Sequence, residues 1–136
     1  MRTLPAALLG LALLAGQAGA QEKQQKEPVL DGRPLSAWIA DLKAPSPQTR
    51  NFAAYTIGTL GPDGKAAVPA LIEALSDSNA SVRFRVCVAL EQMGPAAAEA
   101  APALNNTLDD MSDDVAAAAR RALIKITGKD PGRIGE

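Results

Sequence analysis

The chain contains no histidine and only one cysteine, Cys87, among its 136 residues. Histidine is the commonest general base and the commonest transition-metal ligand in proteins, so its absence argues against both kinds of site. A single cysteine forms no internal disulfide and leaves no cysteine pair to share a zinc ion. We therefore expect no catalytic residue, no metal site and no cofactor, and we expect Cys87 to be a small packing residue.

Aromatic side chains and net charge are also scarce. Aromatic residues make up 3 % of the chain, and 14 basic residues against 15 acidic ones leave a net charge of −1. This balance does not favour a nucleic-acid partner. Hydrophobic residues make up 47 %, and alanine supplies many of them. Alanine and leucine together are typical of closely packed helices, so we expect one small all-α domain.

The first twenty residues have the order of a secretory signal peptide. A short basic start is followed by the uncharged apolar run Leu4–Ala15 and by small residues at Ala18–Ala20. This order predicts cleavage after Ala20 and export to the periplasm or the extracellular space. The alternative is an uncleaved membrane anchor, but the apolar run is short for ~30 Å of hydrocarbon. We expect no membrane span after cleavage.

The ends of the remaining chain are polar. Residues 21–29 offer almost nothing to bury and predict a flexible tether, and residues 129–136 predict a loose C-terminal tail. The folded domain is therefore expected at residues 30–128.

A shift of 33 residues aligns this domain with itself without a gap. It places Pro69 on Pro102 and Leu75 on Leu108, and in the other direction Gly94-Pro95 on Gly61-Pro62. The alignment defines three copies, at about 34–66, 67–99 and 100–128. Long internal periods of this kind are typical of repeat architectures.

Each copy predicts two short helices. In the middle copy Val68, Leu71 and Leu75 form one helical stripe, and "SDSNAS" from Ser76 then predicts a turn. A second stripe follows, and Gly94-Pro95 ends it. Such a hairpin cannot bury both faces alone, whereas three stacked hairpins share a continuous core, which predicts an α-solenoid.

The middle copy, "AVPALIEALSDSNASVRFRVCVALEQMGP", resembles a HEAT-like repeat of the short bacterial variety that is also seen in phycobilisome-lyase proteins. The opening "LDGRPLSAWIADLKAPSPQTR" is similar to the first repeat of many exported bacterial HEAT-repeat proteins. The resemblance implies an armadillo-like, right-handed superhelix of three hairpins. It also implies a structural role for Arg50 and Arg83, which share one repeat position: pairing with acidic or carbonyl groups of a neighbouring turn.

The third copy departs from the other two. Asn105 and Arg120 replace apolar residues, as expected for a terminal repeat whose outer face is uncovered. Its turn carries four aspartates that could hold calcium or could simply favour the start of the next helix: Asp109, Asp110, Asp113 and Asp114. Calcium needs oxygen ligands converging from a shaped loop, so we favour the second interpretation and predict no metal site.

The candidate binding residues lie opposite the buried stripe of the second helices. At 100° per residue, three positions per repeat point away from the core. They are Asn51, Tyr55, Gly58, Phe84, Val88, Glu91, Ala117, Arg121 and Ile124. The resemblance implies that second helices line the concave side. Apolar groups and an arginine mark interaction surfaces, so Tyr55, Phe84, Val88, Arg121 and Ile124 are the candidate protein-binding residues.

The sequence thus favours a non-enzymatic, exported scaffold that binds a protein or peptide on the second helices. The alternatives are a structural, self-associating envelope protein, in which the apolar face is covered by the chain itself or by a homo-oligomer, and a bilin-lyase-like enzyme component. The enzyme alternative is disfavoured by the lack of histidine.

Overall fold

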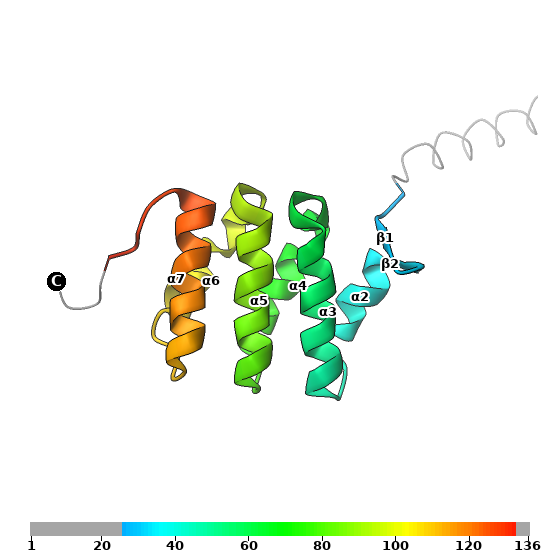
Figure 1. The fold of residues 1–136 in the computed structure, drawn as a ribbon, viewed down its shortest axis with the longest axis horizontal. Coiled ribbons are helices and arrows are strands. Elements are labelled where there is room, and N and C mark those ends of the chain that lie inside the picture. Colours follow the sequence, from blue (N-terminus) through cyan, green and yellow to red (C-terminus); the bar gives the residue numbers. More distant parts are fainter. Residues whose placement is uncertain (1–25, 133–136) are drawn as a thin grey trace, which may run out of the picture.

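The computed structural model describes residues 26–132, so the predicted signal peptide lies outside the described residues. The described chain forms a stack of helical hairpins preceded by a small strand pair (Figure 1). Its elements are β1 (Val29–Leu30), β2 (Arg33–Pro34), α2 (Leu35–Asp41), α3 (Pro47–Thr59), η1 (Gly61–Ala67), α4 (Val68–Ala74), α5 (Ala80–Met93), η2 (Gly94–Ala100), α6 (Ala101–Thr107) and α7 (Asp113–Thr127), where η denotes a 3-10 helix. No helix within residues 26–132 is long and apolar enough to cross a membrane.

The hairpins α2–α3, α4–α5 and α6–α7 follow one another along the stack, which confirms the predicted all-α solenoid. The first helices begin at Leu35, Val68 and Ala101, and the second helices begin at Pro47, Ala80 and Asp113. Equivalent elements therefore start 33 residues apart.

The helices form two layers. The second helices α3, α5 and α7 run side by side at the front of Figure 1, with α4 and α6 behind them and α2 beside α3. α5 packs along both α3 and α7, and the 3-10 segments lie between successive first helices. Fully buried alanines such as Ala53, Ala54 and Ala119 contribute to the core between the layers. Their small side chains let the helices approach closely, which accounts for the alanine-rich composition.

Glycine forms each corner between repeats. Gly61 and Gly94 have φ of 55° and 59°, a region that other residues rarely adopt. The sequence predicts that Gly94-Pro95 ends the helix, and α5 does end there. The chain does not then become irregular, however, because Pro62 and Pro95 each lie in the first turn of a 3-10 helix that leads into the next repeat.

The start of the domain differs from the prediction. The Glu27 carboxylate accepts hydrogen bonds from the N–H (2.7 Å) and Oγ (2.9 Å) of Ser36, and the carbonyl of Pro28 accepts one from the N–H of Leu35 (2.8 Å). Val29 lies in the strand pair, which is antiparallel. The predicted tether is therefore too long, because residues 27–29 belong to the domain.

The predicted C-terminal tail is also partly attached. Asp130 lies 2.7 Å from the Arg120 guanidinium, and its carboxylate accepts a hydrogen bond from the N–H of Gly132 (3.1 Å). Asp130 thus ties the predicted tail to Arg120, which the sequence predicts to be a polar position on the outer face of the third repeat.

Candidate functional site

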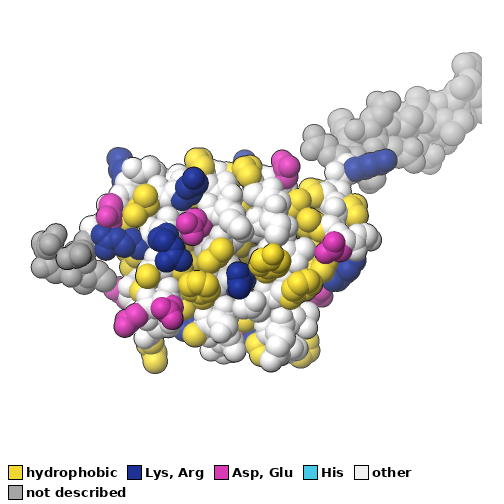
Figure 2. Space-filling view, in the orientation of Figure 1, with side chains coloured by type: hydrophobic (Ala, Val, Ile, Leu, Met, Phe, Trp, Pro, Cys, Tyr) yellow, Lys and Arg dark blue, Asp and Glu magenta, His cyan; other side chains and the backbone are white. Residues whose placement is uncertain are grey.

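The exposed side of α3, α5 and α7 is the candidate interaction surface, and we call it the second-helix face. Figure 2 views the molecule from the same side as Figure 1 and shows hydrophobic and basic side chains gathered over these helices. Three large apolar side chains are exposed on α3 and α7: Phe52 (53 %), Tyr55 (49 %) and Ile124 (40 %).

The five predicted binding residues differ in how far they project. Tyr55, Arg121 and Ile124 are exposed. Phe84 and Val88 are only half-buried rather than open, and Phe84 packs against the core. The face is therefore apolar, but the α5 side chains project less into solvent than a helical wheel of α5 alone predicts.

Two other predicted surface positions are used between helices. Gly58 is buried because α5 approaches it closely. A Cβ at this position would lie 3.0 Å from Ala89 Cα and would collide with the Gln92 side chain. Asn51 donates a hydrogen bond from Nδ2 to the Ser81 carbonyl (3.0 Å). Both residues join α3 to α5. The prediction that Gly58 belongs to an open surface is wrong, because Gly58 is buried, whereas Asn51 remains partly exposed.

A row of aromatic rings crosses the first repeat, and its central member, Phe52, is not among the predicted binding residues. Phe52 meets the buried Trp38 edge-on (centroids 5.7 Å apart, 65°) and stacks on Tyr55 (6.3 Å, 23°). An arginine covers each end of the row. The Cζ of Arg33 lies 4.2 Å from the Trp38 ring centroid, and the Cζ of Arg85 lies 5.3 Å from the Tyr55 ring centroid. Such ring pairs and cation–π contacts are favourable and present flat amphipathic surfaces.

An open depression lies beside this row, at the N-terminal ends of α5 and α7. Its volume is about 540 Å³. Its lining comes from three helices: Asn51, Ala80, Ser81, Phe84, Arg85, Ser112, Asp114 and Val115. It offers one apolar wall, two serine hydroxyls and charges of both signs.

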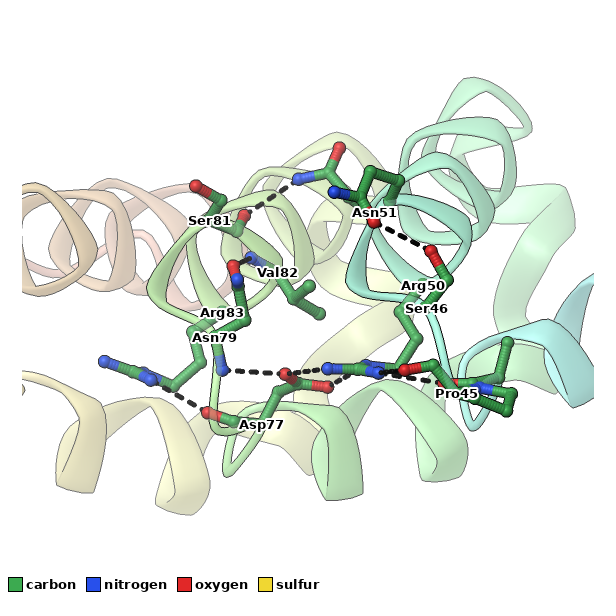
Figure 3. Close-up of polar contacts among 11 residues, drawn as sticks. Pro45, Ser46, Arg50, Asn51, Asp77, Asn79, Ser81, Val82 and Arg83 are labelled. Carbon is green, nitrogen blue, oxygen red and sulfur yellow. Dashed lines mark hydrogen bonds and ion pairs between the residues drawn. The ribbon is translucent and has the colours of Figure 1, made fainter.

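The repeat arginines lie at the turns and not on this face. Arg50 donates from Nε and Nη2 to the two carboxylate oxygens of Asp77 in the next repeat (2.7 and 3.1 Å) (Figure 3). Its Nη1 donates to the Ala44 carbonyl (2.8 Å) of its own turn. The two side chains are only 13 % and 9 % exposed. Arg50 therefore fastens its own turn to the following one.

Arg83 repeats this arrangement one hairpin later. Its Nε and Nη2 donate to Asp110 (2.8 and 3.0 Å), and its Nη1 donates to the Asp77 carbonyl (2.8 Å). We call the four side chains Arg50, Asp77, Arg83 and Asp110 the turn ladder. The equivalent positions at the two ends of the stack are Ala44 and Ala116, so neither end presents half of a further pair.

The turn ladder lowers the pKa of both aspartates. At Asp110 the hydrogen bond from Arg83 is the main cause; burial opposes it, and the N–H of Ser112 adds to it. At Asp77 burial alone raises the pKa. Hydrogen bonds from Arg50 and the N–H of Asn79, with the charges of both arginines, outweigh burial and bring the pKa below 3.8.

We expect a corresponding loss of stability in acid. A carboxyl whose folded pKa is depressed stabilises the fold above its unfolded pKa, here about 3.8, and loses that contribution as pH falls through the folded value. Urea unfolding between pH 7 and pH 2.5 should therefore show a fall below about pH 4 in the wild type. The Asp77→Asn, Asp110→Asn variant should be less stable at pH 7, and its free energy of unfolding should change less between pH 4 and pH 2.5. Parallel curves would contradict the role of these two groups.

The cysteine and the acidic turn that the sequence singles out are both engaged in the structure. Cys87 is fully buried, and burial raises its pKa to about 12. Asp110 of the acidic turn is engaged by Arg83. Within the described residues, no group of three acidic or cysteine side chains is arranged to hold a metal ion.

The comparison with known families agrees with the geometry. A family model described as HEAT repeats matches residues 35–124, from the start of α2 into α7. No curated protein matches the sequence.

Proposed function

Because the chain belongs to the HEAT-repeat family, whose members generally serve as protein-interaction scaffolds, we propose that it is a non-enzymatic scaffold that binds a protein or peptide on the second-helix face. We further propose that it acts after export, in the periplasm or outside the cell. The basic start, apolar run and small residues of the first twenty positions support this location.

The observation that carries the proposal is the exposed apolar surface on α3 and α7. Phe52, Tyr55 and Ile124 keep 53 %, 49 % and 40 % of their surface open to solvent. Aromatic side chains are concentrated in interfaces because they bury a large area for few rotatable bonds. In a chain with 3 % aromatic residues, two of them lie exposed and stacked on one helix.

A capture experiment with an exposed-residue variant tests the face. Tyr55→Glu with Ile124→Glu places charge on the surface and leaves the core untouched, whereas Phe84 and Val88 are too buried for such a change. Met111→Glu is the matched control, because Met111 is apolar and 98 % exposed on a turn. Baits of residues 21–136 would be incubated with the exported protein fraction, and the captured proteins quantified by mass spectrometry.

We expect partners that the wild type and the Met111→Glu control retain and that the double variant loses at least about tenfold. Circular dichroism should show equal helicity for all three baits. Partners retained equally by all three would place binding elsewhere. If the wild type is instead a dimer by light scattering and the double variant a monomer, the face is a contact between copies of this chain.

A further inference from the structure

Arg85 is the one arginine among the described residues that lacks a carboxylate partner. Each of the other five lies within 4.0 Å of a carboxylate oxygen. These pairs are Arg33–Asp41, Arg50–Asp77, Arg83–Asp110, Arg120–Asp130 and Arg121–Glu91. Among the described residues, the Arg85 guanidinium lies over the face of Tyr55, 5.3 Å from the ring centroid.

The Arg85 guanidinium is also incompletely hydrogen-bonded. Its Nε is buried and has no acceptor within hydrogen-bond distance in the described part of the chain. A buried N–H without an acceptor costs free energy, and such groups are rare in folded proteins. Arg85 also lines the depression beside the aromatic row, so an incoming carboxylate can approach its side chain from solvent and meets the buried Nε once the guanidinium turns toward the depression.

We propose that Arg85 anchors a carboxylate of the bound partner, so that the partner presents an aspartate or glutamate next to an apolar side chain. This inference rests on the proposed scaffold function and names the chemistry of its ligand. The planar guanidinium matches a carboxylate with two parallel hydrogen bonds. The apolar neighbour packs against Phe84, which lines the same depression, and against Tyr55, whose ring the Arg85 guanidinium covers.

The remaining charges favour a ligand with a single negative charge. Asp114 lines the same depression and is the acidic residue of its lining. One guanidinium beside one carboxylate attracts a monoanion, whereas a phosphate dianion meets stronger repulsion from Asp114. Asp114 in addition offers an acceptor for a backbone N–H of an extended segment. We therefore assign the site to an acidic peptide and not to a phosphorylated one.

The test selects ligands without assuming their sequence. Protein produced from the full-length sequence would be used to pan a phage library of random 12-residue peptides. The enriched peptides would be synthesised, and their binding to the wild type, Arg85→Gln and Arg120→Gln would be measured by calorimetry. Arg120→Gln is the matched control, because Arg120 is an α7 arginine paired with Asp130.

We expect the enriched peptides to share an aspartate or glutamate beside an apolar residue. Arg85→Gln should weaken their binding about 10- to 100-fold, the range for a hydrogen bond to a charged group. Arg120→Gln should not change it. Replacing the peptide's acid by its amide should cause the same loss, and combining both changes should add little to either one.

The results that would contradict the Arg85 anchor differ from those that would contradict the scaffold function. Peptides without an acid that bind Arg85→Gln and wild type equally overturn the role of Arg85. If those peptides still lose binding to the Tyr55→Glu, Ile124→Glu variant, the scaffold function stands without this anchor. Failure to enrich any peptide overturns the carboxylate anchor at Arg85, whereas the scaffold function is decided separately by the capture experiment.

Discussion

Replacing Arg83 with alanine should lower the free energy of unfolding by about 3 kcal/mol. The change removes both hydrogen bonds to Asp110 and the one to the Asp77 carbonyl. The Asp110 side chain is 10 % exposed, so its charge is left without a cationic partner and with little water. Losing one member of a buried pair is costly for this reason, more than for the attraction itself.

Denaturant unfolding at pH 7 measures this effect. Lys43→Ala is the control, because the Lys43–Glu73 pair is 74 % and 65 % exposed and its removal should leave the midpoint close to wild type. A double variant, Arg83→Met with Asp110→Leu, should recover part of the loss, since it leaves no orphaned charge. If Arg83→Ala and Lys43→Ala unfold at the same midpoint, the turn ladder does not stabilise the stack.

Leu90→Ala should cost about 2–5 kcal/mol, the range for leucine truncation in a packed core. Leu90 is fully buried in α5, and α5 packs against both α3 and α7. A cavity at this position loosens the contact of the middle repeat with both of its neighbours. In a stack where each repeat contacts only its neighbours, the middle repeat takes part in both interfaces, so its loss destabilises the first and third repeats as well.

The same denaturant experiment gives the Leu90→Ala effect. The transition should move to lower denaturant and remain single. Ile124→Ala, on an apolar residue that is 40 % exposed, should shift it far less. A Leu90→Ala protein as stable as Ile124→Ala would show that the middle repeat is not the centre of the core.

The repeat could be predicted from the sequence because every element recurs at one offset. Pro69, Leu75 and Gly94 each have an equivalent 33 residues away, and together they fix where helices begin and end. The structure places the helix starts in the same register. Periodic signals that agree with one another are more reliable than any single turn or cap.

The strand pair at the start of the domain was missed although it carries a local signal. Asp31 and Gly32 both have positive φ, 49° and 74°, which is the conformation that Asp-Gly favours in a tight hairpin. The strands on either side are only two residues long, so no alternation of polar and apolar residues marks them. Their stability comes from the stack, where the Leu30 carbonyl accepts the Trp38 indole N–H (3.1 Å).

The second-helix face was predicted in part because a helical wheel treats one helix at a time. The wheel places Tyr55 and Ile124 correctly on the outside. It cannot show that α5 covers Gly58, nor that Phe52 and Arg85, which occupy equivalent repeat positions, flank Tyr55. These features depend on the distance between neighbouring helices, and no spacing within one helix encodes it.

The turn ladder runs along one edge of the stack only, at the N-terminal ends of the second helices. At the other edge, no ion pair of the described chain involves η1 or η2. The molecule should therefore bend more easily by opening at the η1–η2 edge than by stretching along the ladder. Arg85 lies two residues beyond Arg83, so the depression sits on the stiffer edge. A ligand bound there finds its anchor already in place and loses little affinity to ordering the scaffold.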